Sequence, residues 1–223
     1  MSSAENDAIM KDPSVSYTLA YFDLTSVGAI SRDLLGYSGK QWKCEIHPDI
    51  ILSESMIVDQ YLAGIAGLLG DNDWEGQVIR ALYSSTIFLR EIFYEQVCHQ
   101  PTHAAKVQSL LTTFLPVTFA KWLNAVEFHL QENARRHPES GYFMGNKISL
   151  ADVAVANFFD YMSLHPAMFS EPILAAVRER PVLVRVWDLI AQEPRLAAWR
   201  ASADYKRLVK STDPASEYMA RLL

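Results

Sequence analysis

Residues 145–159, which read GNKISLADVAVANFF, decide the fold of this chain. Ser149 and Asp152 have the spacing of a capping box, in which the serine hydroxyl accepts the N3 backbone N–H and the acidic side chain reaches back to the serine N–H. Ile148 before the cap and Val153 four residues into the helix are spaced as a hydrophobic staple. Because the residues after Asp152 are apolar on nearly every face, the sequence predicts a central, buried helix that begins at Ser149.

The composition is that of a globular protein with enough apolar residues for a core. Hydrophobic residues make up 50% of the 223 positions, and the net charge is −6 without any Lys- and Arg-rich run. Nucleic acid is therefore not an expected partner. The first residues include no apolar h-region, and no apolar run approaches the length of about 18 residues that a membrane span needs. We therefore expect neither a secretory signal nor a membrane span. The expected location is the cytoplasm.

The cysteines and histidines do not suggest a metal site. Cys44 and Cys98 lack C-x-x-C spacing, which argues against a disulfide framework or a zinc site and fits a reducing compartment. Either thiol could be a nucleophile, although a lone cysteine among apolar residues is more often part of the packing. His99 and His103 are four residues apart, but Pro101 interrupts any helix between them. No metal cofactor is expected.

The first third of the chain has the pattern of a strand–helix–strand unit. A short apolar and aromatic run over residues 17–22 predicts a buried strand, and residues 27–35 have apolar residues at helical spacing. The helix is expected to close within residues 36–39, where glycine can adopt the left-handed conformation. Residues 41–46 alternate between apolar and polar and predict a second strand, so a βαβ unit begins here. Residues 52–62 read as a polar turn that enters an amphipathic helix.

The rest of the chain is predicted to be helical. Helices are expected over residues 78–97, 104–136 with a kink at Pro116, 149–164, 171–180 and 181–192, with a last turn around Trp199. The predicted organisation is a flexible arm over residues 1–16, a small α/β lobe over 17–69, a linker over 70–73, an all-helical domain over 74–210 and a tail over 211–223.

Three stretches resemble one known family. Residues 142–152, which read YFMGNKISLAD, are similar to the buried-helix signature in the C-terminal domain of soluble glutathione transferases. Residues 17–39 are similar to the opening of the sigma-, alpha-, mu- and pi-like cytosolic members, and residues 181–199 resemble the final helices of the family. The resemblance spans about Tyr17 to Leu208. It implies an α+β fold of two domains, a small truncated thioredoxin-like lobe followed by a larger all-α C-terminal domain.

The resemblance also implies a glutathione site. Tyr21 corresponds to the hydroxyl that hydrogen-bonds the glutathione sulfur, and such a bond favours the thiolate and lowers its pKa. On the sequence alone, Tyr21 could equally be a core aromatic, and Thr25 and Ser26 are alternative hydroxyl donors. Glu54-Ser55 corresponds to the pair that receives the γ-glutamyl carboxylate at a helix start, although a serine there could merely cap the helix. Trp42 completes the expected glutathione-binding set.

The same resemblance implies glutathione as co-substrate, an apolar electrophile as the second substrate, and a homodimer packed along the helices that begin near Trp74 and Ala104. Aromatic residues of the helical domain are candidates to line the electrophile site, although most of them are expected in the core. The electrophile itself is not encoded in any short motif.

The chain departs from the family in one interval. Members place a helix, a loop with a cis-proline and a strand between the second strand and the Ser-containing turn, whereas this chain has only the five residues 47–51 there. The basic residue that often follows the first strand is also missing. Two alternatives to an active transferase follow: a catalytically silent binding or scaffold protein of the same fold, or a gene model that lacks an internal segment. The short lobe is expected to need cover for Trp42, Ile46 and Leu52, from the N-terminal arm or a partner.

Overall fold

A computed structural model describes residue 12 and residues 16–20, 28–45, 54–164 and 170–210. The small lobe contains strand β1 (Tyr17–Ala20), helix α2 (Ala29–Ser38), strand β2 (Trp42–Glu45) and helix α3 (Ser55–Ile65). The two strands are parallel, with Tyr17 opposite Trp42 and Ala20 opposite Glu45. Helix α2 ends at Gly39, whose φ of 68° is the left-handed conformation expected there. The predicted βαβ unit is therefore confirmed.

The two-stranded sheet has an inner and an outer face. Tyr17, Leu19 and Trp42 are partly buried and pack against the core, whereas Thr18 and Lys43, the next pair in register, are exposed. Trp42 lies against Trp199, with ring centroids 5.1 Å apart. The cover expected for Trp42 thus comes from the helical lobe of the same chain. Ile46 and Leu52 lie outside the described residues.

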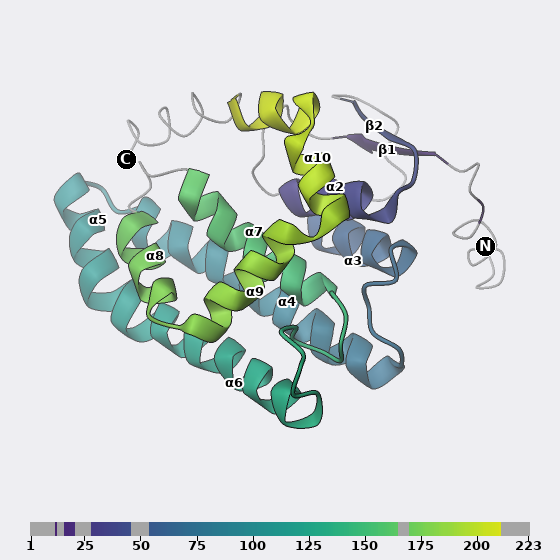
Figure 1. Ribbon diagram of the computed structural model, residues 1–223. Helices are drawn as coiled ribbons and strands as arrows, with labels where there is room; N and C mark the ends of the chain where they lie inside the picture. The colour runs from purple at the N-terminus through teal and green to yellow at the C-terminus, as the bar shows by residue number, and fades with distance from the viewer. Residues whose placement is uncertain (1–11, 13–15, 21–27, 46–53, 165–169, 211–223) are drawn as a thin grey trace.

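The helical lobe forms the larger part of the molecule (Figure 1). Its elements are α4 (Asp73–Phe93), η1 (Tyr94–Cys98), α5 (His103–Ser109), η2 (Leu110–Phe119), α6 (Ala120–Arg136), α7 (Leu150–Leu164), α8 (Ser170–Arg178), α9 (Pro181–Gln192) and α10 (Pro194–Ala201). The α+β class and the order of a small lobe followed by a helical lobe agree with the sequence-based prediction. The exact domain boundaries, including the linker at residues 70–73, stay a prediction.

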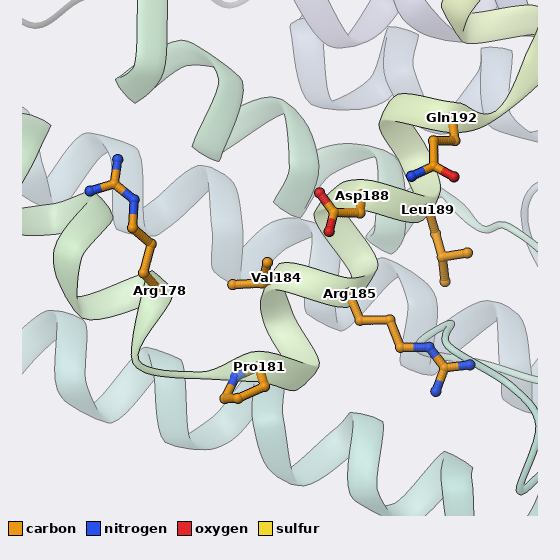
Figure 2. Close-up of a pocket in the computed structure, with 7 residues that line it drawn as sticks. All are labelled: Arg178, Pro181, Val184, Arg185, Asp188, Leu189 and Gln192. Atoms are coloured by element: carbon orange, nitrogen blue, oxygen red, sulfur yellow. The ribbon is translucent and has the colours of Figure 1, made fainter.

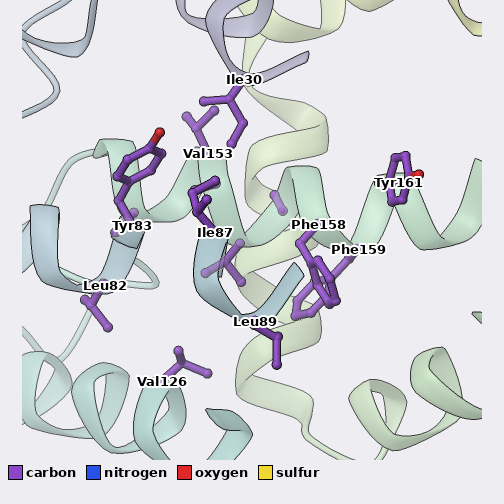
Figure 3. Packing of buried hydrophobic residues seen from close by; sticks show 14 of the residues in the cluster. Ile30, Leu82, Tyr83, Ile87, Leu89, Val126, Val153, Phe158, Phe159 and Tyr161 are labelled. Atoms are coloured by element: carbon purple, nitrogen blue, oxygen red, sulfur yellow. The ribbon is translucent and has the colours of Figure 1, made fainter. Parts of the chain in front are cut away.

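Helix α7 is the centre of the helical lobe. Every residue from Leu150 to Phe159 is buried, and side chains from α2, α4, α6 and α7 meet in one core (Figure 3). The N–H of Leu150 donates to the carbonyl of Leu68 at 2.9 Å, which ties the start of α7 to the end of the small lobe. The prediction of a central, buried helix is confirmed.

The predicted capping box is present in a modified form. The N–H of Ser149 donates to Asp152 Oδ2 at 2.8 Å, as expected. The hydroxyl of Ser149, however, donates to the same oxygen at 2.5 Å rather than accepting the N3 N–H. The other oxygen of Asp152 accepts the N–H of Phe143 at 2.9 Å. A buried carboxylate attracts every donor within reach because it has lost its water, which explains why the hydroxyl turns toward it.

The long helix predicted over residues 104–136 changes its pitch instead of being uniform. Residues Leu110–Phe119 form π-helical turns, and Pro116 lies inside this segment. Proline has no N–H to donate and its ring clashes with the carbonyl four residues earlier. A wider turn accommodates such a residue inside a helix. Within the described ranges, no helix is long and apolar enough to cross a membrane.

Candidate functional site

The predicted site residues begin two different elements of the small lobe. Glu54 immediately precedes α3 and Ser55 is its first residue, whereas Trp42 is the first residue of β2. Tyr21, Thr25 and Ser26 lie outside the described residues. The structure thus brings Glu54 and Ser55 together at one helix start and places Trp42 against Trp199 of α10.

The start of α3 has an unusual backbone. Glu54 has a φ of 68° and a ψ of 109°. Among the residues that the structure describes, it is the only non-glycine residue with a positive φ. Its carbonyl accepts the N–H groups of Ile57 at 2.9 Å and Val58 at 3.0 Å, but its side chain does not cap the helix. The first N–H groups of α3 therefore keep the partial positive charge that suits a carboxylate.

A buried carboxylate holds α3 in place. Asp59 is fully buried and accepts hydrogen bonds from the hydroxyl of Ser31 on α2 and from the hydroxyl of Tyr83 on α4, the latter at 2.7 Å. Burial raises the pKa of Asp59 to about 7, while the two hydrogen bonds and the positive charge of Arg90 oppose this rise. The orientation of the helix start is thus fixed by bonds from two neighbouring helices.

A second buried ion cluster joins α2 to the helical lobe. Arg200 on α10 lies 2.8 Å from Asp33 Oδ2 on α2 and 2.8 Å from Asp160 Oδ2 on α7. The indole N–H of Trp187 donates to the other oxygen of Asp160 at 2.7 Å. Burial raises the pKa of Asp160, and the positive charge of Arg200 opposes that shift. One guanidinium therefore bridges carboxylates from both lobes.

A third cluster of polar side chains, centred on Arg90, lies between α4 and α7. Arg90 is 3% exposed, its Nη2 donates to Asn157 Oδ1 at 3.3 Å, and its guanidinium carbon is 5.2 Å from the centre of the Tyr161 ring. The hydroxyls of Tyr161 and Tyr94 are 2.5 Å apart. Within the described residues, Nε and Nη1 of Arg90 have no hydrogen-bond partner. Burial raises the pKa of the Tyr94 phenol, and the positive charge of Arg90 opposes this shift.

A cavity of about 450 Å³ lies on the outer side of α9 and the end of α8 (Figure 2). It is lined by Arg178, Pro181, Val184, Arg185, Asp188, Leu189 and Gln192. Its two cations already have partners, because Arg178 pairs with Glu171 at 2.6 Å and Arg185 donates to the carbonyl of Glu139 at 3.4 Å. Figure 2 shows the two arginine side chains diverging from each other. None of the predicted site residues lines this cavity, and we do not assign it a role.

The sequence-based reasoning missed Asp59, Arg90 and Arg200. A signal existed for the first two, because each is a charged residue at a position where the helical period places apolar neighbours, with Leu62 after Asp59 and Phe93 after Arg90. A charged side chain on the buried face of a helix needs a partner. Such a residue is therefore a candidate for a structural or functional role. No comparable signal identifies Arg200, whose partner Asp33 is 167 residues away in the chain.

Comparison with known proteins gives a family and a fold. The model of the family described as "Glutathione S-transferase, C-terminal domain" matches residues 90–203. Among solved structures, a prostaglandin synthase D of Nilaparvata lugens is 19% identical and has a TM-score of 0.67, with 83% of this chain and 97% of that chain covered. A glutathione S-transferase from Necator americanus, described as monomeric, is 17% identical with a TM-score of 0.66, covering 83% and 96%. At such identities these likenesses concern the fold alone.

Proposed function

This chain belongs to the glutathione S-transferase family, and from that premise we propose that it binds glutathione and transfers the thiolate to an apolar electrophile. The observation that carries the proposal is the start of α3, at Glu54 and Ser55. There the first turn has no side-chain cap from Glu54, and Asp59 holds the helix between α2 and α4. An uncapped helix start is a site for an anionic group such as the γ-glutamyl carboxylate.

In this proposal Tyr21 activates the sulfur. A free thiol is mostly protonated at neutral pH, and a donor hydroxyl at the sulfur favours the thiolate. Trp42 belongs to the glutathione-binding set on the basis of family resemblance. Its edge-to-face contact with Trp199 restrains the ring, so any contact with glutathione would involve the part of the indole that Trp199 leaves uncovered.

The first experiment measures glutathione binding by titration calorimetry. Ser55→Ala should weaken binding about tenfold, because it removes one hydroxyl from an anion site. Ser85→Ala is the matched control: its hydroxyl donates to the carbonyl of Leu82 on α4, so binding should not change. Equal binding by the parent and Ser55→Ala would contradict the role given to this serine.

The second experiment tests activation of the sulfur. Tyr21→Phe removes only a hydroxyl and should lower turnover with an aryl halide about 10²–10⁴-fold, the range for one positioned proton donor or acceptor. Glutathione binding should change much less than turnover. A variant as active as the parent would make Thr25 or Ser26 the candidate instead.

A catalytically silent binding or scaffold protein is the second candidate function. It is favoured by the short interval of residues 47–51, which has too few residues for a helix, a proline turn and a strand. A catalytically silent protein should show no affinity for glutathione, whereas a transferase should bind it. Sequencing the transcript separates both from a truncated gene model, because only the gene model predicts an in-frame insertion near Asp49.

We also propose a homodimer and a cytoplasmic location. Large apolar side chains stay exposed on the helices that the family resemblance assigns to the interface: Trp74 and Phe88 on α4 are 71% and 59% exposed, and Phe128 on α6 is 56% exposed. Trp74 and Phe88 are close to four helical turns apart, so they share one face of α4. Exposed aromatic residues aligned in this way are typical of a protein–protein interface, and analytical ultracentrifugation would test for the dimer.

A further inference from the structure

Asp59 and Ser55 lie on the same face of α3, four residues apart, which corresponds to a rise of about 6 Å along the helix. Ser55 begins the helix, whereas Asp59 is fully buried. In the function proposed above, the first turn of α3 receives the γ-glutamyl carboxylate of glutathione. The bound carboxylate and the buried carboxyl group of Asp59 would then be neighbours, one turn of the helix apart.

Two neighbouring helices hold the carboxyl group of Asp59. The hydroxyl of Ser31 on α2 donates to Oδ1, and the hydroxyl of Tyr83 on α4 donates to Oδ2 at 2.7 Å. In Figure 3 the hydroxyl of Tyr83 points toward the side of the core where Ile30 of α2 lies. A hydroxyl group can donate or accept a hydrogen bond. The same two hydroxyls can therefore satisfy either the ionised or the neutral acid.

The charged groups around Asp59 leave its charge only partly compensated. On α4, Arg90 contributes a positive charge that favours the carboxylate. On α2, Arg32 and Asp33 follow Ser31 and are buried, but Asp33 is paired with Arg200. Burial raises the pKa of Asp59 to about 7, although both hydrogen bonds and the charge of Arg90 oppose this rise. Asp59 therefore changes its charge near neutral pH.

We propose that Asp59 is a positioning residue whose charge sets the affinity of the α3 start for glutathione, an inference that rests on the proposed function. The neutral acid keeps α3 bonded to α2 and α4 without a buried charge. The ionised acid places a negative charge one turn from the ligand carboxylate, and like charges repel more strongly where water is largely excluded.

This arrangement couples ligand binding to proton binding. A ligand that binds more tightly when Asp59 is neutral must also make Asp59 bind its proton more tightly, because linkage is reciprocal. The affinity for glutathione should therefore fall as the pH rises through about 7, the pKa of Asp59. Binding near that pH should take up a fraction of a proton.

Titration calorimetry with S-methylglutathione tests the proposal, because the sulfur of this ligand carries no titrating proton. The parent should bind about three- to tenfold more tightly at about pH 6 than at about pH 8. Asp59→Asn keeps the shape of the side chain and should remove this difference. In buffers of low and high ionisation enthalpy at neutral pH, the parent should show proton uptake on binding and Asp59→Asn should show none.

Two further variants separate positioning by Asp59 from a purely structural role. Ser31→Ala and Tyr83→Phe each remove a hydrogen bond that lowers the pKa of Asp59. Each should move the pH at which affinity falls upward, by about one unit. A purely structural loss would weaken binding equally at every pH. Ser38→Ala, whose hydroxyl donates to the carbonyl of Leu35 on α2 at 2.7 Å, is the matched control and should not move it.

Hydrogen exchange gives a measurement that needs no ligand. The N–H groups of Ile57 and Val58 donate to the carbonyl of Glu54 in the first turn of α3. In the parent, their exchange should rise between about pH 6 and 8 by more than the intrinsic increase, because ionised Asp59 weakens the docking of α3. Asp59→Asn should show the intrinsic increase alone.

The outcomes distinguish this inference from the proposed function. Binding of S-methylglutathione that does not depend on pH would overturn the inference and leave the proposed function intact. A dependence on pH that Asp59→Asn retains would do the same. Absence of binding by the parent at every pH would overturn the proposed function and, with it, the role of Asp59 in binding.

Discussion

At the scale of single residues, the hydrogen bond between the hydroxyl of Tyr83 and the carboxylate of Asp59 makes the stability of the fold depend on pH. The hydroxyl donates to the buried carboxylate at 2.7 Å, and burial raises the pKa of Asp59 from 3.8 to about 7. Because the folded state binds this proton more tightly than the unfolded state does, the contribution of Asp59 to stability is greatest below about pH 4. It falls as the pH rises toward 7.

Tyr83→Phe should therefore lower the free energy of unfolding by about 1–3 kcal/mol, and more at pH 8 than at pH 5. At the higher pH Asp59 is ionised, and a buried carboxylate needs its donors more than the neutral acid does. Urea denaturation at both pH values measures the difference. Tyr37→Phe, whose half-buried ring stacks with Arg195, is the control. A loss that is the same at both pH values would mean that Asp59 does not titrate in this range.

At the scale of elements, helix α7 depends on Asp152. This carboxylate is fully buried and accepts three donors: the N–H and hydroxyl of Ser149 and the N–H of Phe143. Asp152→Ala would leave those donors buried without an acceptor, so it should cost about 2–4 kcal/mol, more than a simple exposed cap. Ser149→Ala removes only one donor and should cost about 1 kcal/mol. Thermal melts of the two variants compare them, and equal midpoints would contradict the role of Asp152.

Most elements of the fold could be predicted from the sequence, because each has a local cause. The predicted bounds of α9, residues 181–192, match the structure at both ends, since Pro181 starts a helix at little cost. The widened turns around Pro116 were missed because a proline inside a helical pattern predicts a disturbance but not its form. The hydroxyl of Ser149 was assigned the wrong role because its direction depends on the burial of Asp152, which a short motif does not encode.

At the scale of the whole molecule, the contact between the lobes depends on Arg200. It bridges Asp33 of the small lobe and Asp160 of α7, and Asp33 is almost fully buried. Replacing Arg200 with Met leaves two carboxylates without their cation, and the loss should be about 3–5 kcal/mol. Arg195→Met, on the exposed side of the same helix, should cost much less. Urea denaturation followed by tryptophan fluorescence measures both, and equal losses would exclude a special role for Arg200.

Contacts between residues far apart in the chain also mark the limit of what the sequence alone can predict. Arg90 and Asn157 are 67 residues apart, and Arg200 and Asp33 are 167 apart, so no local pattern pairs them. For the candidate site, the family resemblance predicts that Glu54 and Ser55 bind a carboxylate, and this role stays a prediction; in the structure the two residues lie at the start of α3. Periodicity could not have assigned that role, because a serine that caps a helix and a serine that binds a carboxylate leave the same local pattern.

The strained backbone of Glu54 is expected to lower the stability of the fold while it favours glutathione binding. A non-glycine residue at a φ of 68° and a ψ of 109° carries conformational strain of about 1–3 kcal/mol. Glycine adopts such angles freely but loses more entropy on folding. Glu54→Gly should therefore raise the free energy of unfolding by about 1 kcal/mol, while weakening glutathione binding in the same titration that tests Ser55. A more stable variant that binds glutathione less well would mean that the strain is retained for binding and not for folding.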